Sequence, residues 1–398
     1  MKIAWFCIPA HGHTNPTLAL VKAMTEAGHT VYYFSFARFR EKLERAGAHF
    51  IGCDGYDFEM EDKENADRVG KDMAFATELL VSSTLALHDM VGQKVQEIQP
   101  DLIVSDSVAY WGKLTAMRYG IPYVSSTTTF AFNRYSSAYM KHGVGELFRM
   151  LCAMPKIQRQ IKRLQEKGYP VKSILEIVQN DNETNTIVYT SQYYQPCAET
   201  FSGHYCFIGP SIRPVEQPME KTADKTVYLS LGTVVRNETF YCNCIEALRE
   251  TDYQVIVSLG ESAERLKKEW QEFLDNLPEH IQVFDTVDQM AVLSIADVFI
   301  THCGMNSASE GLYFEVPLLL CPQTPEQEAV AKRTEELGAG IWLHTSQKDT
   351  ILEAVRQLSK QPAYKQSAQN IARSFRESGG VEKAKQFLET IRLQNAPL

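Results

Sequence analysis

The sequence lacks any apolar run of the roughly 18 residues that a membrane-spanning helix requires, so we expect no transmembrane span. It also lacks a basic stripe, because 40 Lys and Arg residues stand against 49 Asp and Glu residues, for a net charge of −9. Phosphate backbones would repel so acidic a chain, which argues against a nucleic-acid partner. No Gly-x-Gly-x-x-Gly pattern follows the first apolar segment, which argues against a nicotinamide or flavin cofactor.

The sequence also has few features that would indicate a metal site or secretion. The nine cysteines are scattered, and Cys242-x-Cys244 is their closest pair. We therefore expect reduced thiols in a cytoplasmic protein. His11 and His13 alternate as two metal ligands in a strand would, but no further ligand follows at metal-binding spacing, so we expect no metal. The apolar segment 3–9 is short and lacks a small-residue cleavage site, so we interpret it as a strand and not as a signal peptide.

The sequence does contain a repeated alternation of strand and helix signals. Its 398 residues, 44% hydrophobic and 22% charged, suit a soluble enzyme of two domains of roughly 200 residues each. Helical patterns, such as Pro16 to Ala27 with Asn15 as the expected N-cap, separate short apolar runs. The expected strands are 3–8, 30–36, 49–52, 102–105, 123–126 and 186–189, then 227–231, 254–258, 282–284, 298–300, 318–321 and 340–343. This order predicts an α/β fold with one doubly wound parallel sheet in each half.

A proline-rich segment separates the two halves. Pro210, Pro214 and Pro218 lie close together, which is typical of a linker, although a long surface loop would have the same composition. The predicted organisation is an N-terminal Rossmann-like domain, a linker, a C-terminal Rossmann-like domain and a final helix. Their predicted ranges are 1–208, 209–224, 225–379 and 380–398.

The most informative segment begins at the predicted strand 298–300. A tight turn with Gly304 follows it, and then a helix that opens with small polar residues. Such a helix start directs N–H groups and the positive end of the helix dipole at one point, which is an anion site. Glu310, one turn further along, could accept hydrogen bonds from sugar hydroxyls, so the segment suits a nucleotide sugar. The alternative is a capping box, in which Ser307 and Glu310 only close the helix N-terminus.

A second constellation follows from the predicted sheet order. In an open parallel sheet, ligands bind where the strand order reverses, beyond the carboxyl ends of the first and fourth strands. His13 follows the first strand and Asp106 follows the fourth, so we expect their side chains to be neighbours. An imidazole oriented by a carboxylate is a general base. The alternative is that His13 only starts a helix and that Asp106 binds backbone groups.

The region from Phe130 to Lys172 departs from this alternation. It is rich in aromatic residues and methionine, which at helical spacing predict either a core or the wall of an apolar ligand pocket. The basic stretch 156–172 is typical of the solvated face of a helix. The aromatic and methionine side chains of the region are Phe130, Phe132, Tyr135, Tyr139, Met140, Phe148, Met150 and Met154.

Two motifs carry a resemblance to a known family. The pattern His-x-Gly-x-Asn-Ser-x-x-Glu over 302–310, followed by Pro317, Pro322 and the pair Glu326-Gln327, resembles the donor signature of family 1 glycosyltransferases. It is most similar to the bacterial macrolide and flavonoid glucosyltransferases. The pattern Pro-x-x-Gly-His-x-Asn-Pro over 9–16 resembles the acceptor-side motif, whose His is the base. The resemblance implies the GT-B fold, in which two Rossmann-like domains face each other across a cleft.

The resemblance also implies roles for individual residues. The diphosphate would be held by four residues of the donor motif, His302, Gly304, Asn306 and Ser307, with assistance from Thr233 in an earlier loop. The uracil would be bound by Val287 and Gln289, which precede the motif. The hexose would be bound by Glu326 and Gln327, which follow it. Glu310 would bind the ribose. The candidates for the acceptor pocket are Tyr110, Phe130, Phe132, Tyr135 and Tyr139.

The expected function is therefore the inverting, metal-independent transfer of a hexose from a UDP-sugar. Glucose is the expected sugar, and the acceptor is expected to be a hydroxyl of a small hydrophobic molecule such as a flavonoid or macrolide. His13 would be the base and Asp106 its orienting partner. Alternatives are a UDP-sugar epimerase or cell-wall transferase on the same fold, and a non-catalytic protein that binds nucleotide sugars. We expect a monomer or weak homodimer that needs no cofactor.

Overall fold

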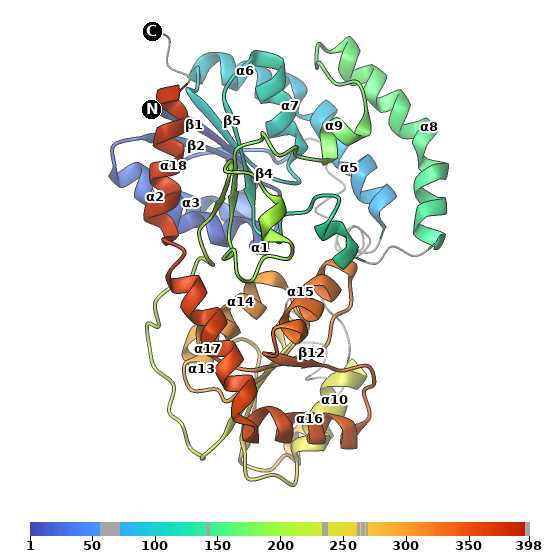
Figure 1. The fold of residues 1–398 in the computed structure, drawn as a ribbon, viewed down its shortest axis with the longest axis vertical. Coiled ribbons are helices and arrows are strands. Elements are labelled where there is room, and N and C mark those ends of the chain that lie inside the picture. Colours follow the sequence, from blue (N-terminus) through green and yellow to red (C-terminus); the bar gives the residue numbers. More distant parts are fainter. Residues whose placement is uncertain are drawn as a thin grey trace. The chain divides into compact units, whose positions relative to one another are not determined.

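The computed structural model describes residues 1–55, 72–140, 144–232, 238–260 and 270–394, together with residues 263 and 267. The chain divides into two compact units. Unit 1 comprises Met1–Ser211 and Glu377–Leu398, and unit 2 comprises Ile212–Arg376. The division falls inside the proline-rich segment 209–224, and each unit contains its own parallel sheet (Figure 1).

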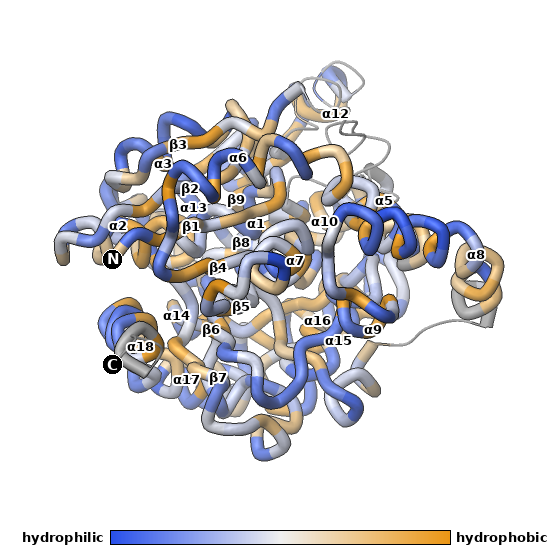
Figure 2. The backbone as a smooth tube through the Cα atoms, turned by 90° about the horizontal axis from the view of Figure 1, so that it is seen from above, coloured by the Kyte–Doolittle hydropathy of each residue, from blue (hydrophilic) through white to orange (hydrophobic). Residues whose placement is uncertain are grey.

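Unit 1 is built on a seven-stranded sheet in the order β3-β2-β1-β4-β5-β6-β7. Its strands are β1 (Lys2–Phe6), β2 (Thr30–Ser35), β3 (His49–Gly52), β4 (Leu102–Asp106), β5 (Tyr123–Thr127), β6 (Thr186–Val188) and β7 (Tyr205–Phe207). Neighbouring strands pair in parallel. The β1 and β4 strands are neighbours, and the strand order reverses between them. Both strands are hydrophobic over most of their length (Figure 2). This is typical of central strands of a parallel sheet, which are covered on both faces.

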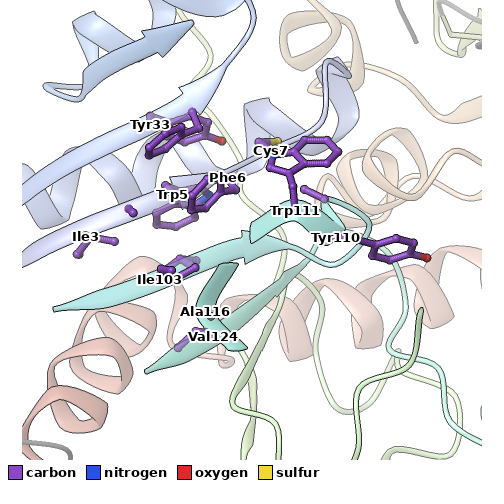
Figure 3. Close-up of a cluster of buried hydrophobic side chains, with 14 of the residues drawn as sticks. Ile3, Trp5, Phe6, Cys7, Tyr33, Ile103, Tyr110, Trp111, Ala116 and Val124 are labelled. Carbon is purple, nitrogen blue, oxygen red and sulfur yellow. The ribbon is translucent and has the colours of Figure 1, made fainter. Parts of the chain in front are cut away.

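The described helical segments of unit 1 connect these strands and cover the sheet. They are α1 (His11–Thr14), η1 (Asn15–Thr17), α2 (Leu18–Glu26), η2 (Ala37–Phe39), α3 (Arg40–Arg45), α5 (Met73–Ala86), α6 (His88–Ile98), α7 (Tyr110–Tyr119), η4 (Ser136–Tyr139), α8 (Val144–Glu166), α9 (Ile174–Val178), η5 (Ala198–Thr200) and α18 (Gly380–Gln394). Large rings fill the space between sheet and helices. The Trp5 and Tyr33 rings stack at 5.8 Å, the Phe6 and Phe34 rings stack at 4.3 Å, and Trp111 of α7 is buried beside them (Figure 3).

One local expectation for unit 1 was wrong, and one strand was missed. The first helix begins at His11, and Ala10 is its N-cap. Asn15 does not cap a helix, because its φ of −57° and ψ of −42° are helical and the chain runs through η1 into α2. The β7 strand was not expected, because a three-residue edge strand carries too little periodicity to be recognised in a sequence.

The last helix, α18, packs within unit 1. Ala384 and Leu388 are buried in its core, and α18 contacts α2. The His29 Nε2 and Glu389 Oε1 atoms are 3.0 Å apart, and the Gly380 N–H donates to the Ile208 carbonyl. The chain therefore returns to unit 1 after completing unit 2.

Unit 2 contains a six-stranded parallel sheet in the order β10-β9-β8-β11-β12-β13. Its strands are β8 (Thr226–Ser230), β9 (Gln254–Ser258), β10 (Ile281–Phe284), β11 (Val298–Thr301), β12 (Leu318–Leu320) and β13 (Gly340–Trp342). The described helices are α10 (Glu238–Leu248), α12 (Gln271–Asp275), α13 (Gln289–Leu293), α14 (Met305–Tyr313), α15 (Pro325–Glu336), α16 (Lys348–Lys360) and α17 (Pro362–Arg376). Here β8 and β11 are the neighbours between which the order reverses, so both halves have the predicted doubly wound topology. No helix in the described part of the chain is long and apolar enough to cross a bilayer.

Candidate active site

The first candidate site lies where β1 and β4 end in unit 1. These strands pair in register, with Phe6 opposite Ser105, so the residues that follow them emerge side by side. The α1 helix presents His13, and Asp106 is the last residue of β4. The His13 Nδ1 and Asp106 Oδ2 atoms are 2.7 Å apart, although the residues are 93 positions apart in the sequence.

The environment of Asp106 makes it an orienting group. Its side chain is 1% exposed, whereas that of His13 is 21% exposed. Its other oxygen, Oδ1, accepts a hydrogen bond from the Val108 N–H at 3.0 Å. A buried carboxylate held in this way favours the imidazole tautomer with the proton on Nδ1. The lone pair of His13 is then on Nε2, which is the state that a general base requires.

Other polar groups surround this pair. The Thr128 hydroxyl oxygen, just after β5, is 3.3 Å from His13 Nδ1 and is almost fully buried. Burial and the nearby Asp106 carboxylate raise the pKa of the Tyr110 hydroxyl and of the Cys7 thiol. Both groups therefore remain protonated at neutral pH, and Cys7 is no nucleophile.

The second candidate site lies at the reversal point of unit 2. Thr301 of β11 pairs with Ser230 of β8, which places the residues after both strands together. The His302 ring lies between two glycines. A Cβ atom on Gly232 would be 2.5 Å from its Cε1, and one on Gly304 would be 2.6 Å from its Nε2. Only residues without a side chain allow the ring this position.

His302 is neutral in this environment, because burial lowers its pKa to about 4. Its Nδ1 atom is buried and has no hydrogen-bond partner within the described ranges. Such an atom can form a hydrogen bond with a ligand group that approaches the ring. The ring therefore offers a neutral hydrogen-bonding group and not a positive charge.

The turn into α14 brings backbone N–H groups to the same place. Cys303 has a φ of 66°, which is uncommon for a residue with a side chain, and Gly304 is the N-cap of α14. A helix has no internal acceptors for the N–H groups of its first turn. The sequence 301–313 contains no Lys or Arg, so these dipoles and the neutral imidazole are the groups that the motif offers to an anion.

Glu310 belongs to a hydrogen-bonded chain that starts in the sheet. The Tyr228 hydroxyl donates to Gln289 Oε1 at 3.1 Å, and the Gln289 amide donates to Glu310 Oε2. Poor solvation raises the pKa of Glu310 to about 7, although the Gln289 hydrogen bond and the nearby Arg213 favour its ionised form. The carboxyl group is therefore close to half-ionised at neutral pH.

The structure excludes the capping-box alternative for this segment. The N-cap of α14 is Gly304 and not Ser307, so Ser307 and Glu310 lie too far along the helix to form the box. A box-like arrangement does occur at α15, where the Thr324 hydroxyl accepts from the Gln327 N–H at 3.4 Å. There the Gln327 side-chain oxygen accepts from the Gln323 N–H at 2.8 Å.

Asp288 has a structural role next to this chain. Its Oδ1 atom caps α13 by accepting from the Met290 N–H at 3.1 Å. The same atom is 2.6 Å from Arg213 Nη2. The pair ties the start of unit 2 to the junction between Val287 and the first residue of α13, Gln289.

The remaining predicted residues have different surroundings. Thr233 lies outside the described residues. Val287, Asn306, Ser307, Glu326, Phe132 and Tyr139 are half-buried. Phe130 is only 1% exposed and packs on Tyr194 with the ring centroids 5.3 Å apart, which places it in the interior of unit 1. Tyr135 is 48% exposed, and the Arg134 guanidinium lies 4.6 Å from its ring centroid.

Sequence reasoning missed three residues that contact the predicted ones or their neighbours. Thr128 could have been found by extending the strand-end rule to β5. Tyr228 and Arg213 gave no signal, because an aromatic residue in an apolar strand and a cation in a linker are common. Within the described ranges, no group of three or more His, Cys, Asp or Glu side chains could hold a metal ion.

Comparison with known proteins relates the chain to glycosyltransferases. Residues 243–378 match the family described as erythromycin biosynthesis protein CIII-like, C-terminal domain. The chain is 32% identical to an NDP-glycosyltransferase of Bacillus licheniformis, covering 97% of this chain and 96% of that protein. It is 26% identical to an oleandomycin glycosyltransferase of Streptomyces antibioticus, over 97% and 90% of the two chains. The solved glycotransferase of kitacinnamycin shares the fold, with a TM-score of 0.84, 24% identity and 98% of each chain covered.

The raised pKa of Glu310 predicts how this residue affects stability. A carboxyl group whose pKa rises on folding, here from 4.5 to about 7, contributes stability that is present below the unfolded pKa and lost as the pH rises through 7. We expect Glu310→Gln to raise the free energy of unfolding by about 1–3 kcal/mol at pH 8, and the gain to vanish near pH 4.5. Urea unfolding at both pH values measures this difference.

Glu315→Gln is the matched control in the same unit. Its partner Arg376 lowers the pKa of Glu315, so this substitution should destabilise the protein at pH 8 and not stabilise it. A Glu310→Gln variant that is less stable than the wild type at pH 8 would contradict the described environment.

Proposed function

We propose that this chain, which belongs to the family 1 glycosyltransferases, transfers glucose from UDP-glucose to a hydroxyl of a small hydrophobic acceptor, with inversion at the anomeric carbon. Membership of the family makes the chain an enzyme that uses a nucleotide sugar. The donor's base and sugar, the acceptor class and the residue roles are the parts that we propose. The hydrogen bond of 2.7 Å between His13 and the buried Asp106 is the observation that carries the proposal.

His13 is the proposed general base. Asp106 holds the proton on Nδ1, so Nε2 accepts the proton of the acceptor hydroxyl while its oxygen attacks C1 of the donor sugar. The new C1–O bond forms as the bond from C1 to the diphosphate oxygen breaks, and the electron pair of that bond leaves with UDP. The imidazolium formed at His13 is stabilised by the Asp106 carboxylate. A single displacement without an enzyme nucleophile inverts the configuration at C1.

The diphosphate is assigned to the start of α14. The N–H groups of the first turn and the helix dipole stabilise the charge that develops on the departing oxygen. The neutral His302 ring adds a hydrogen bond from its fixed position between Gly232 and Gly304. Gly304, Asn306 and Ser307 belong to the same turn. This arrangement supplies what a metal ion would otherwise provide, so we propose that the reaction needs none.

The nucleoside is assigned to the chain that links Tyr228, Gln289 and Glu310. Ionised Glu310 can accept hydrogen bonds from both ribose hydroxyls. The proposed contacts of the uracil are Val287 and Gln289, which flank the Asp288 residue that Arg213 holds in place.

Glu326 and Gln327 are the proposed contacts of the hexose. The Gln327 oxygen already accepts from a backbone N–H, so its NH₂ group is the part that can donate to a sugar hydroxyl. The name of the Streptomyces relative, an oleandomycin glycosyltransferase, supports a natural-product acceptor here. Phe132, Tyr135 and Tyr139 are the predicted pocket residues with some exposure. All nine cysteines are free thiols, which supports a cytoplasmic location.

Product analysis tests the proposed reaction. The purified chain with UDP-glucose and a flavonol should yield UDP and a product heavier by one hexose, with the β configuration at C1, and EDTA should not change the rate. Hydrolysis of UDP-glucose without transfer, release of an epimerised UDP-sugar, or loss of activity that Mn²⁺ or Mg²⁺ restores would each contradict the proposal.

His13→Ala should lower the transfer rate by ~10²–10⁴, because the proton of a weakly acidic hydroxyl then has no acceptor. The measurement is the turnover number with a saturating donor. Asp106→Asn should have a smaller effect, since the imidazole remains but its tautomer is no longer imposed.

His11→Ala is the matched control. His11 is exposed and packs edge-on against Phe39, with ring centroids 5.0 Å apart, so its loss should leave the turnover unchanged. Turnover of His13→Ala within tenfold of the wild type would disprove the assignment of the base.

Glu310→Gln should weaken UDP-glucose binding by roughly 10- to 150-fold, because a charged acceptor is replaced by a neutral amide. Wild-type affinity should rise with pH through about 7, as the Glu310 carboxyl group ionises, and affinity of the variant should be flat. Calorimetric titration over this pH range gives both results. UDP-glucose suits the titration because its diphosphate does not change its charge there. Equal affinities of the two proteins at pH 8 would remove Glu310 from the donor site.

A further inference from the structure

We propose that the outer face of α8 docks unit 1 onto a membrane surface that contains anionic lipids. The inference is independent of the proposed reaction. It starts from apolar side chains that α8 exposes although its inner face is already packed. On the inner side, Met150, Ala153 and Met154 pack against the core of unit 1, and α8 contacts α5 and α9 (Figure 1).

The exposed apolar residues form one stripe. Phe148 is 67% exposed and Leu151 is 63% exposed, and Cys152 and Pro155 are also exposed. Their spacing of i, i+3, i+4 and i+7 places them on one face of the helix. A water-exposed helix face normally carries polar residues, so this apolar stripe indicates a surface that is covered in use.

The same face continues into a positive region. Arg159, Lys162 and Arg163 follow the apolar stripe by one to two turns and are exposed. None of the three forms an ion pair within the described ranges, whereas Lys156 next to them pairs with Glu78. These cations form a local positive cluster in a chain of net charge −9.

This combination suits the interface of an anionic bilayer. Aromatic and aliphatic side chains insert at the level of the headgroups, and nearby Lys and Arg side chains bind the acidic headgroups. An acidic body repelled by the same surface would orient the protein with α8 towards it.

A second copy of the chain is a poorer occupant. Two α8 helices packed in parallel would bring like charges together. Two α8 helices packed in antiparallel orientation would bury the charged Arg159 and Lys162 of one copy against the apolar Phe148 and Leu151 of the other.

Sedimentation with lipid vesicles tests the proposal. The full chain should bind vesicles of phosphatidylglycerol and phosphatidylcholine in equal parts, should bind phosphatidylcholine alone at least roughly tenfold more weakly, and should be released by salt. The double variant Phe148→Ser with Leu151→Ser should lose roughly tenfold or more of the binding to the mixed vesicles. Arg159→Gln with Lys162→Gln should remove the preference for phosphatidylglycerol.

Two control variants separate this face from general surface effects. Leu175→Ser removes a residue of α9 that is 57% exposed, and Lys22→Gln removes an exposed cation of α2. Both should bind vesicles like the wild type, and circular dichroism should confirm that every variant is folded.

Three outcomes would overturn the inference. The first is a wild-type chain that does not bind the mixed vesicles. The second is vesicle binding that the double variant retains in full. The third is a double variant that only changes the molecular mass in sedimentation equilibrium or the KM for a water-soluble acceptor, because the stripe would then be a dimer contact or a wall of the acceptor pocket.

Discussion

The reversal of strand order in each parallel sheet is the constraint on which the rest depends. Parallel strands end at the same edge, and the helices on either side of the reversal leave the edge open between them. In unit 1 this places His13 and Asp106 within 2.7 Å of each other. In unit 2 it places His302 against Gly232. Neither contact could form if the two strands were separated in the sheet.

The two candidate sites differ in the charged groups that they contain. In unit 1 a buried carboxylate faces an imidazole, so a proton taken up by His13 meets a compensating charge. In unit 2 the groups offered to an anion are neutral, because burial lowers the pKa of His302 to about 4 and the motif has no cation. An acidic group, Glu310, is also poorly solvated there. Burial of polar groups that shifts their pKa values in this way is common at functional sites.

The α8 helix has one face packed in the core and another face exposed, and both faces carry apolar residues. Its inner face completes the core of unit 1, which explains the helical spacing of Met150 and Met154 in the sequence. Its outer face repeats the apolar spacing with Phe148 and Leu151. The amino-acid composition of α8 cannot tell the buried face from the exposed one, because apolar residues occur on both. The position of α5 decides which face of α8 is covered.

The sequence by itself determined the two doubly wound sheets, the pairing of His13 with Asp106 and the strand-turn-helix segment that carries Glu310, because alternating periodicity and strand ends are local signals with a fixed geometric consequence. Tertiary structure alone decided what touches these residues. The contact of Thr128 with His13, the support of Gln289 by Tyr228, and the exclusion of the capping box by the true start of α14 all depend on backbone paths and packing. Such contacts join distant segments, and no local pattern encodes the distance between them.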